Sequence, residues 1–256
     1  ETEMTTLLYL DCETIPCQRP DILDELKASM SADLASKIAA IAPPGNYKKQ
    51  ETIDAWYADE APKVRAAMQS EFENELDSTY RKTSFDGAFG QVCVIGFAVN
   101  DEPAITLFNE DWQDERTLLE NFACCLTSDI EHKDFVTVVG HNVASFDLRF
   151  LMHRYIVNGI RPHSVISRAA QAKPWESDKV FDTMVQWAGV GNRIKLDKLC
   201  KALNVPTPKG ELDGSKVWDY VNAGRIEEVA AYCKKDVEAT RQVYKRMTFA
   251  TELQAA

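Results

Sequence analysis

Three stretches of the chain are apolar and rich in β-branched or aromatic residues, a pattern typical of buried strands. They cover residues 5–14, 91–99 and 135–140. Residues 104–108 form a shorter run of the same kind. They follow Asn100-Asp101-Glu102-Pro103, a turn sequence that predicts a hairpin with the second strand.

Helical spacing dominates much of the remaining sequence. In residues 20–41 the apolar positions recur at three- and four-residue steps, namely Leu23, Leu26, Met30, Leu34, Ile38 and Ile41. Pro43-Pro44-Gly45-Asn46 ends this helix, and a second one is predicted over residues 52–80 with a kink at Pro62. The two helices form an insertion after the first strand, at about residues 16–83.

Later helices are predicted over residues 118–126, 146–158, 180–188, 196–203, 217–223 and 226–247. The chain contains no internal repeat and no linker of low complexity. Strands followed mostly by helices predict a single α/β domain over residues 1–256, built on a mixed sheet flanked by helices.

The composition narrows the class of protein. Of the 256 residues 45% are hydrophobic, which suits a globular protein with a sizeable core. No apolar run approaches the roughly 18 residues that a membrane helix requires, and we see no signal peptide, so no membrane partner is expected. Seven cysteines without a C-x-x-C pair argue against zinc sites and disulfide frameworks, and favour a reducing cytoplasm.

The net charge of −11 is unevenly distributed along the chain. Residues 149–217 hold 12 Lys and Arg against 6 Asp and Glu, whereas the remainder holds 17 against 34. An acidic protein with a basic segment can still bind a polyanion locally. The charge therefore does not exclude nucleic acid as a partner.

The first strand ends in two acids at alternate positions, Asp11 and Glu13. Alternate side chains of a strand leave on the same face, so these carboxylates are expected about 7 Å apart along the strand. Their repulsion would be relieved by a hard divalent cation, Mg²⁺ or Mn²⁺. Short D-x-E strings also occur at solvated strand ends, so the pair alone does not establish a metal site.

Two further polar clusters follow. Gly140-His141-Asn142-Val143-Ala144-Ser145-Phe146-Asp147 lies where a buried strand passes into a helix, a frequent position of ligand sites in α/β sheets. Tyr232 and Asp236 lie one turn apart on a late helix and share a face. Each also has a simpler interpretation: Asp147 as an acid at a helix N-terminus, Tyr232 as a half-buried aromatic, and Asp236 as half of a surface ion pair.

Together, D-x-E at a strand end, N-x-x-x-F-D at a strand–helix junction and Y-x-x-x-D on a late helix resemble the motifs of the DEDDy 3′–5′ exonucleases. These enzymes have a ribonuclease-H-like fold. The resemblance is closest to the proofreading exonuclease domain of B-family DNA polymerases and its stand-alone relatives. It covers residues 7–247 apart from the insertion.

The resemblance implies a function and its requirements. It implies a 3′–5′ exonuclease that uses two Mg²⁺ or Mn²⁺ ions and releases 5′ mononucleotides. The implied substrate is single-stranded nucleic acid with a free 3′-OH, with DNA preferred and an exoribonuclease of the same fold as the alternative.

Roles for single residues follow from the same resemblance. Asp11 is expected to bridge both ions, Glu13 and Asp236 to complete the site of the ion that carries the attacking water, and Asp147 to support the second ion through water. Tyr232 would orient the attacking water. Substrate contacts are expected at Cys12, Thr14, His141, Asn142 and Phe146. The simpler interpretation of His141 is a local hydrogen-bonding residue, and that of Asp182 is a helix N-cap.

Other interpretations remain open at this point. Asp11-Cys12-Glu13-Thr14 follows a buried strand much as the D-x-D-x-T of haloacid-dehalogenase-type phosphatases does, although Glu13 departs from that pattern. A non-catalytic nucleic-acid-binding module that holds a structural ion is a third interpretation, and Tyr232 argues mildly against it. Lys48 and Lys49 are predicted to lie on a mobile flap over the substrate, or else on an exposed loop without a role.

Overall fold

The computed structural model describes residues 5–130, 135–208 and 212–250. Its strands are β1 (Thr6–Ile15), β2 (Gln91–Val99), β3 (Ile105–Leu107), β4 (Val136–Gly140) and β5 (Val180–Asp182). The helices before β4 are α1 (Pro20–Ala39), α2 (Gln50–Asp59), α3 (Ala61–Lys82) and α4 (Glu115–Ile130). The later helices are α5 (Asp147–Val157), α6 (Ser164–Ala170), α7 (Thr183–Ala188), α8 (Leu196–Ala202), α9 (Val217–Asn222) and α10 (Ile226–Met247). Two 3₁₀ turns complete them, η1 (Thr83–Phe85) and η2 (Gly214–Lys216).

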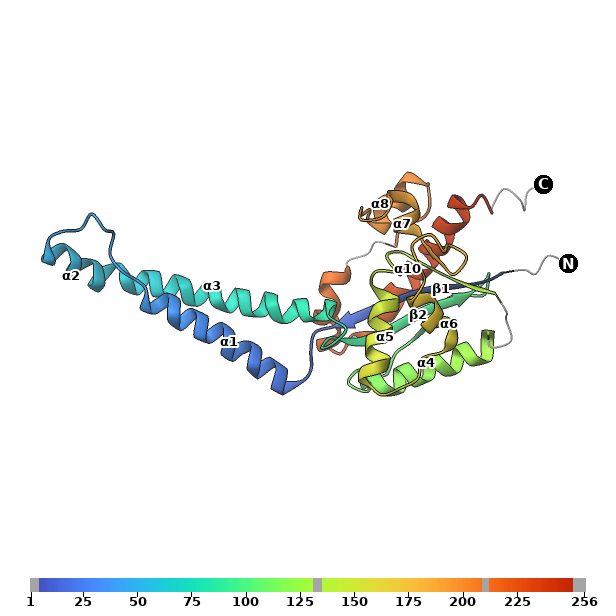
Figure 1. Ribbon diagram of the computed structural model, residues 1–256, viewed down its shortest axis with the longest axis horizontal. Helices are drawn as coiled ribbons and strands as arrows, with labels where there is room; N and C mark the ends of the chain where they lie inside the picture. Colours follow the sequence, from blue (N-terminus) through green and yellow to red (C-terminus); the bar gives the residue numbers. More distant parts are fainter. Residues whose placement is uncertain (1–4, 131–134, 209–211, 251–256) are drawn as a thin grey trace.

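The strands form one mixed sheet in the order β3-β2-β1-β4-β5. β1 pairs antiparallel with β2 and parallel with β4, so the first strand of the sequence lies at the centre of the sheet. The expected α/β fold, a mixed sheet flanked by helices, is therefore confirmed (Figure 1). Within the described ranges no helix is both long and apolar enough to span a membrane.

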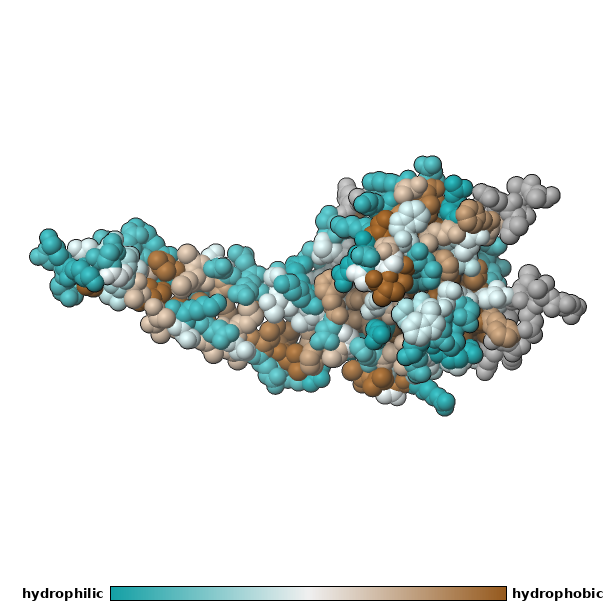
Figure 2. Space-filling model, turned by 45° about the horizontal axis from the view of Figure 1, so that its top comes forward, coloured by the Kyte–Doolittle hydropathy of each residue, from teal (hydrophilic) through white to brown (hydrophobic). Residues whose placement is uncertain are grey.

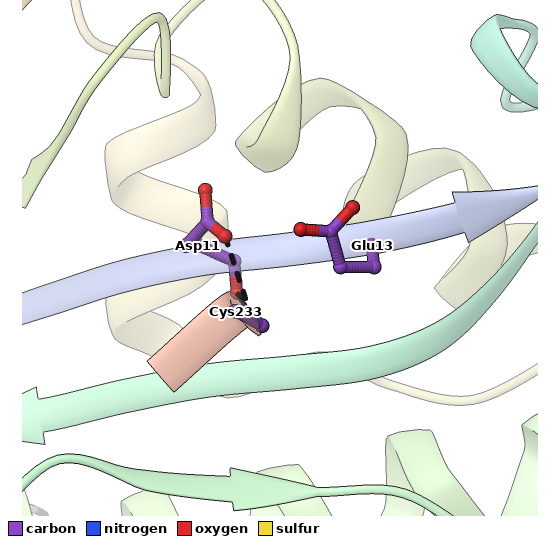
Figure 3. A group of neighbouring side chains, drawn as sticks. All are labelled: Asp11, Glu13 and Cys233. Carbon is purple, nitrogen blue, oxygen red and sulfur yellow. Dashed lines mark hydrogen bonds between the residues drawn. The ribbon is translucent and has the colours of Figure 1, made fainter. Parts of the chain in front are cut away.

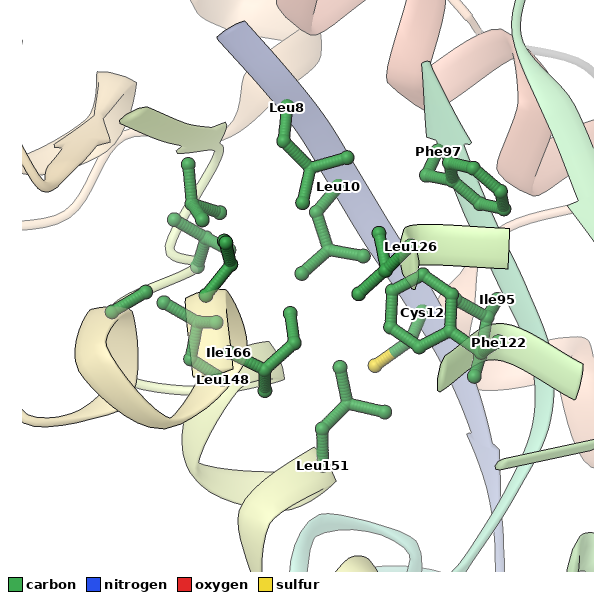
Figure 4. Close-up of a cluster of buried hydrophobic side chains, with 14 of the residues drawn as sticks. Leu8, Leu10, Cys12, Ile95, Phe97, Phe122, Leu126, Leu148, Leu151 and Ile166 are labelled. Atoms are coloured by element: carbon green, nitrogen blue, oxygen red, sulfur yellow. The ribbon is translucent and has the colours of Figure 1, made fainter. Parts of the chain in front are cut away.

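Alternation along β1 divides its side chains between the two faces of the sheet. Leu8, Leu10 and Cys12 point into the larger hydrophobic core, which α4, α5 and α6 cover (Figure 4). Tyr9 packs on the opposite face with Val237 of α10. Tyr9, Asp11 and Glu13 are at every second position of β1, so their side chains leave on the same face. The two acids therefore lie on the face that α10 covers.

Two of the predicted helices differ in the structure. Residues 180–188 are not one helix, because Val180–Asp182 forms β5 beside β4 and only Thr183–Ala188 is helical. Three residues are too few for periodicity to separate a strand from a helix. Residues 52–80 divide into α2 and α3 at Glu60, two residues before Pro62. Glu60 keeps a right-handed helical backbone, so the predicted kink is present as a one-residue break between two helices.

The insertion forms a long arm that projects from the sheet domain, with α1 beside α3 and α2 at the far tip (Figure 1). The arm has little core, because α1 buries no residue and α3 buries only Ala61. Apolar side chains, including Leu23, Leu26 and Leu76, line a shallow groove on it, and Figure 2 shows such residues at its surface.

The position of Lys48 and Lys49 contradicts the predicted flap over the substrate. Both lysines lie in the segment between α1 and α2, at the end of the arm farthest from the sheet (Figure 1). The reason is the length of the flanking helices. α1 has 20 residues and α3 has 22, and each residue adds about 1.5 Å of rise, so they carry this loop away from the strand ends.

Gly96 allows α10 to approach the centre of the sheet. Gly96 pairs with Asp11 across the β1–β2 ladder. A Cβ at this position would lie 2.7 Å from Cys233 Sγ and 3.0 Å from Val237 Cγ2, both on α10. Only glycine therefore permits the helix to pack this closely against the strand that carries Asp11.

We predict that Gly96→Ala will lower the free energy of unfolding by about 1–3 kcal/mol, the usual cost of overpacking a well-packed core. Urea denaturation measures the change. Gly45→Ala is the matched control, because nothing lies within 4 Å of that added Cβ, and its stability should stay within about 0.5 kcal/mol. Adding Cys233→Ala should recover part of the loss. A Gly96→Ala protein as stable as the wild type would contradict the close approach.

Candidate active site

The acids of β1 lie together beneath α10. One ligand atom from each of Asp11, Glu13 and Cys233 falls within 4.8 Å of the others. Figure 3 shows the two carboxylates on β1 and Cys233 reaching Asp11 from α10. Glu13 is buried, with 8% of its surface exposed, whereas Asp11 is only half-buried. The site is therefore closed to solvent at Glu13 and partly open to solvent at Asp11.

Asp147 joins these acids from the other face of β1. It is the first residue of α5 and is 3% exposed. Its Oδ1 accepts a hydrogen bond from the backbone N–H of Cys12, 2.9 Å away. The backbone of Cys12 is an expected substrate contact, and in this structure its N–H is already bonded to Asp147.

Tyr232 and Asp236 approach the same acids from α10. The negative charges of Asp236 and Glu13 act on the Tyr232 phenol, and a hydrogen bond links Tyr232 to Asp236. Among the described residues, Asp236 Oδ1 is buried and has no hydrogen-bond partner. The structure thus brings together all five predicted catalytic residues: Asp11, Glu13, Asp147, Tyr232 and Asp236.

The pKa values reflect burial together with mutual repulsion. Burial raises the pKa of Asp11, and the charges of Asp147, Glu13 and Asp236 raise it further. Burial also raises the pKa of Glu13 above its usual range, with Asp236 and Asp147 adding to the effect. The same cause, burial, raises the pKa of Asp147 to about 7 and that of Asp236 to about 6, although hydrogen bonds oppose each shift. These groups disfavour charge unless a cation lies among them.

The site residues fit divalent ions of the hard class. Four carboxyl groups converge, and an oxygen of Asp236 lacks a partner, which is the kind of donor that Mg²⁺ and Mn²⁺ prefer. Tyr232 keeps its proton, because burial and the neighbouring negative charges raise the pKa of its phenol. The phenol can therefore donate a hydrogen bond but cannot act as a base.

Cys233 belongs to the site although its sequence position did not single it out. Its thiol donates to Asp11 Oδ2 at 3.3 Å, and burial raises the pKa of that thiol well above its usual value. It therefore remains a protonated donor and holds Asp11 in place. The available signal was its position three residues before Asp236, which places both on one helical face.

His141 and Asp182 hold the turn between β4 and α5. The ring nitrogens of His141 contact Thr183 Oγ1 at 2.9 Å and the carbonyl of Ile194 at 2.8 Å. The carboxylate of Asp182 accepts from the backbone N–H groups of Asn142 and Ala144, and it also caps α7. The N-cap interpretation of Asp182 is therefore confirmed, and its carboxylate also fixes the turn that leads to Asp147.

Asn142 and Phe146 lie in this turn. Asn142 has a φ of +65°, a left-handed conformation that asparagine tolerates better than most residues. Phe146 precedes Asp147, and its ring lies 5.5 Å from that of Phe150 and 6.2 Å from that of Phe85. Thr14, the remaining predicted substrate contact, donates its hydroxyl to the carbonyl of Ser84 at 2.7 Å.

Comparisons with known proteins agree with this architecture. The chain resembles the family B DNA polymerase from the hyperthermophilic archaeon Pyrobaculum calidifontis, with a TM-score of 0.52 and 14% sequence identity. The similarity covers 96% of this chain but only 25% of the polymerase, so it supports the fold alone. A search of curated proteins gives no match.

The family assignment rests on the second part of the chain. A family model described as "Predicted 3'-5' exonuclease related to the exonuclease domain of PolB" matches residues 78–255. This range contains Asp147, Tyr232 and Asp236, whereas Asp11 and Glu13 lie before the arm and outside the match. The match spans more than half of the chain, and the structure adds β1 to the same site. The chain therefore belongs to the family of predicted 3′–5′ exonucleases related to the exonuclease domain of PolB.

Proposed function

We propose that the protein is a two-metal-ion 3′–5′ exonuclease that removes 5′ mononucleotides from single-stranded nucleic acid. The observation that carries the proposal is the convergence of four carboxyl groups and one protonated phenol around Asp11 and Glu13 of β1. Buried acids that raise one another's pKa values are costly to a fold, so a binding role is the simplest reason to retain them.

Asp11, Glu13, Asp147 and Asp236 would hold the two ions, Mg²⁺ or Mn²⁺. When bound, these ions would stabilise charge on the attacking water and on the leaving 3′ oxygen of the substrate. The thiol of Cys233 fixes the rotamer of Asp11 through its hydrogen bond. The backbone of Cys12 does the same for Asp147.

Tyr232 would orient the attacking water. Its high pKa keeps the proton on the phenol, so Tyr232 acts as a donor and Asp236 accepts from it. Because the phenol and Asp236 lie on one face of α10, the helix fixes their relative positions.

The substrate would lie over the surface beside Phe146, which precedes the first residue of α5. Phe146 offers an aromatic face for a base, Asn142 and Thr14 offer polar groups beside it, and neither kind of contact reads base edges. His141 uses both ring nitrogens within the protein, so its part would be to position the turn. Cys12 would contribute through its neighbours Asp11 and Glu13, because its own N–H holds Asp147.

DNA is the proposed substrate. RNA remains the alternative, because every proposed contact could be made with either nucleic acid. We treat the chain as one nuclease domain with the arm inserted at about residues 16–83. A reducing cytoplasm is its proposed location, where its cysteine thiols would stay free. The family match favours a nuclease over a phosphatase of the haloacid-dehalogenase type.

Matched single-stranded DNA and RNA oligonucleotides, labelled at the 5′ end and incubated with Mg²⁺ or Mn²⁺, test the proposal. We expect stepwise shortening from the 3′ end and release of 5′ mononucleotides. Asp11→Ala should reduce turnover by much more than tenfold, that is, by well over about 1.4 kcal/mol of barrier.

A closed circular single strand serves as the control substrate, because it has no 3′ end. Efficient cutting of the circle would overturn the exonuclease assignment. Asp11→Ala protein that retains a tenth of wild-type turnover would instead overturn the role of Asp11 between the ions. Circular dichroism would establish that the variant is folded.

Metal-free protein should lose stability as the pH rises from about 4 to 7. Asp147 and Asp236 have raised pKa values in the folded state, so the folded protein retains protons that the unfolded chain has released. Each such carboxyl lowers the free energy of unfolding by up to about 1.4 kcal/mol per pH unit in that range. Urea titrations at pH 5 and 8 with EDTA measure this.

Two additions make the stability test specific to the site. Mg²⁺ or Mn²⁺ should raise the stability at pH 8, because it binds the folded state only. Asp147→Asn should flatten the pH dependence and weaken the effect of the ions. Stability that is independent of both pH and metal would contradict a strained carboxylate cluster.

Tyr232→Phe should lower turnover about 10²-fold, the low end for a group that acts on a proton or water in the transition state. Metal affinity should barely change, because the phenol is not among the proposed ligands. Isothermal titration with Mn²⁺ measures the affinity, and single-turnover cleavage measures the chemical step.

Tyr232→His should not restore activity, because the shorter imidazole does not reach the position of the phenol oxygen. Full activity in Tyr232→Phe would reduce Tyr232 to a packing role.

A further inference from the structure

A second groove lies at the base of the arm, next to the end of β1. Its volume is about 290 Å³. The residues that line it come from β1, from the end of α3 with η1, and from the η2–α9 region. The ones used below are Thr14, Asp77, Arg81, Lys82, Phe85 and Trp218.

Phe85 and Thr14 place this groove beside the candidate active site. Phe85 is 68% exposed as a residue, yet its ring lies edge-on to that of Phe146, with 6.2 Å between the ring centroids. Thr14 lines the groove and follows Glu13 directly, and its hydroxyl is bonded to the carbonyl of Ser84. A strand that leaves Phe146 along this surface therefore meets a second aromatic face.

Among the described residues that line the groove, Lys82 is the cation that remains available. Arg81 is held by Asp77 and Asp219, each at 2.8 Å, so its guanidinium is already paired and these three groups carry a net charge of −1. Lys82 is exposed, and within the described part of the chain its side chain has no ion-pair or hydrogen-bond partner. An aromatic face with one available ammonium group matches one base and one phosphate.

We propose that this groove is a nucleotide subsite of the single-stranded substrate. A base of the strand, beyond the terminal nucleotides at the metal site, stacks on Phe85, and a neighbouring phosphate pairs with Lys82. The proposal rests on the exonuclease function proposed above. It gives the base of the arm a role in holding substrate, with no sequence preference, because stacking and phosphate contacts do not read base edges.

Cleavage of substrates of two lengths tests the subsite. Full-length wild-type, Phe85→Ala and Lys82→Ala proteins would each be given a dinucleotide and a single-stranded decamer with Mg²⁺. The dinucleotide has at most one nucleotide beyond the terminal one, so it can make fewer contacts with the groove than the decamer can. Phe85→Ala should raise the KM for the decamer about tenfold, the usual scale for one base stacked on an aromatic ring, and should change kcat much less. For the dinucleotide the rise in KM should be clearly smaller.

Binding of a fluorescent single-stranded decamer in EDTA, followed by anisotropy over a range of salt concentrations, gives a readout independent of cleavage. Phe85→Ala should weaken binding, and Lys82→Ala should reduce the salt slope by about 0.7, the contribution of one phosphate contact on a single strand. Phe89→Ala and Lys49→Ala are the matched controls. Phe89 is a partly exposed phenylalanine of the neighbouring turn, and Lys49 lies at the tip of the arm.

The outcomes separate the two proposals. If Phe85→Ala and Lys82→Ala bind and cleave the decamer as their controls do, the subsite is wrong, whatever the enzyme's activity. A KM that rises equally for the dinucleotide and the decamer also overturns it, because Phe85 would then act within the terminal site. A third outcome is that the wild-type protein cleaves neither substrate, while the Phe85→Ala variant binds the decamer more weakly than the wild type does. That result would support the subsite and overturn the exonuclease function.

Discussion

Repulsion among buried carboxyl groups is the constraint on which the rest of the site depends. Asp11, Glu13, Asp147 and Asp236 come from three separate elements, and the fold must bring them together against their mutual repulsion. It does so with fixed backbone contacts and close packing. The Cys12 N–H binds Asp147, the Cys233 thiol binds Asp11, and Gly96 removes the one Cβ that would keep α10 away.

The junction between β4 and α5 shows a second way of holding functional groups. Asp182 lies at the end of the neighbouring parallel strand, and its carboxylate gathers backbone N–H groups from both the turn and α7. His141 connects the same turn to Thr183 and Ile194. Polar residues that sequence reasoning weighed as substrate contacts or as a simple cap thus fix the conformation in which Asn142, Phe146 and Asp147 are presented.

The tip of the arm projects away from the sheet domain, whereas its base is bonded to the sheet. Its tip lies far from the acids, while its base, at the end of α3 and in η1, contacts β1 through the Thr14–Ser84 hydrogen bond. The α1–α3 pair buries almost no side chain, so its stability depends on helix propensity and a narrow apolar seam. Chemistry near the substrate is therefore expected at the base, where the backbone is held by the sheet.

The sequence alone determined the β1 acids, the strand–helix junction and the Tyr232–Asp236 helix, because each depends on local periodicity and spacing of three or four residues. It also determined the class of fold. Other features depend on contacts between distant segments: the pairing that makes Val180–Asp182 a strand, and the contact of Cys233 with Asp11. The location of Lys48 and Lys49 likewise follows from helix length and direction, which carry a loop away from the site. Contacts between segments far apart in the sequence are not encoded in local periodicity, so only the tertiary structure decided them.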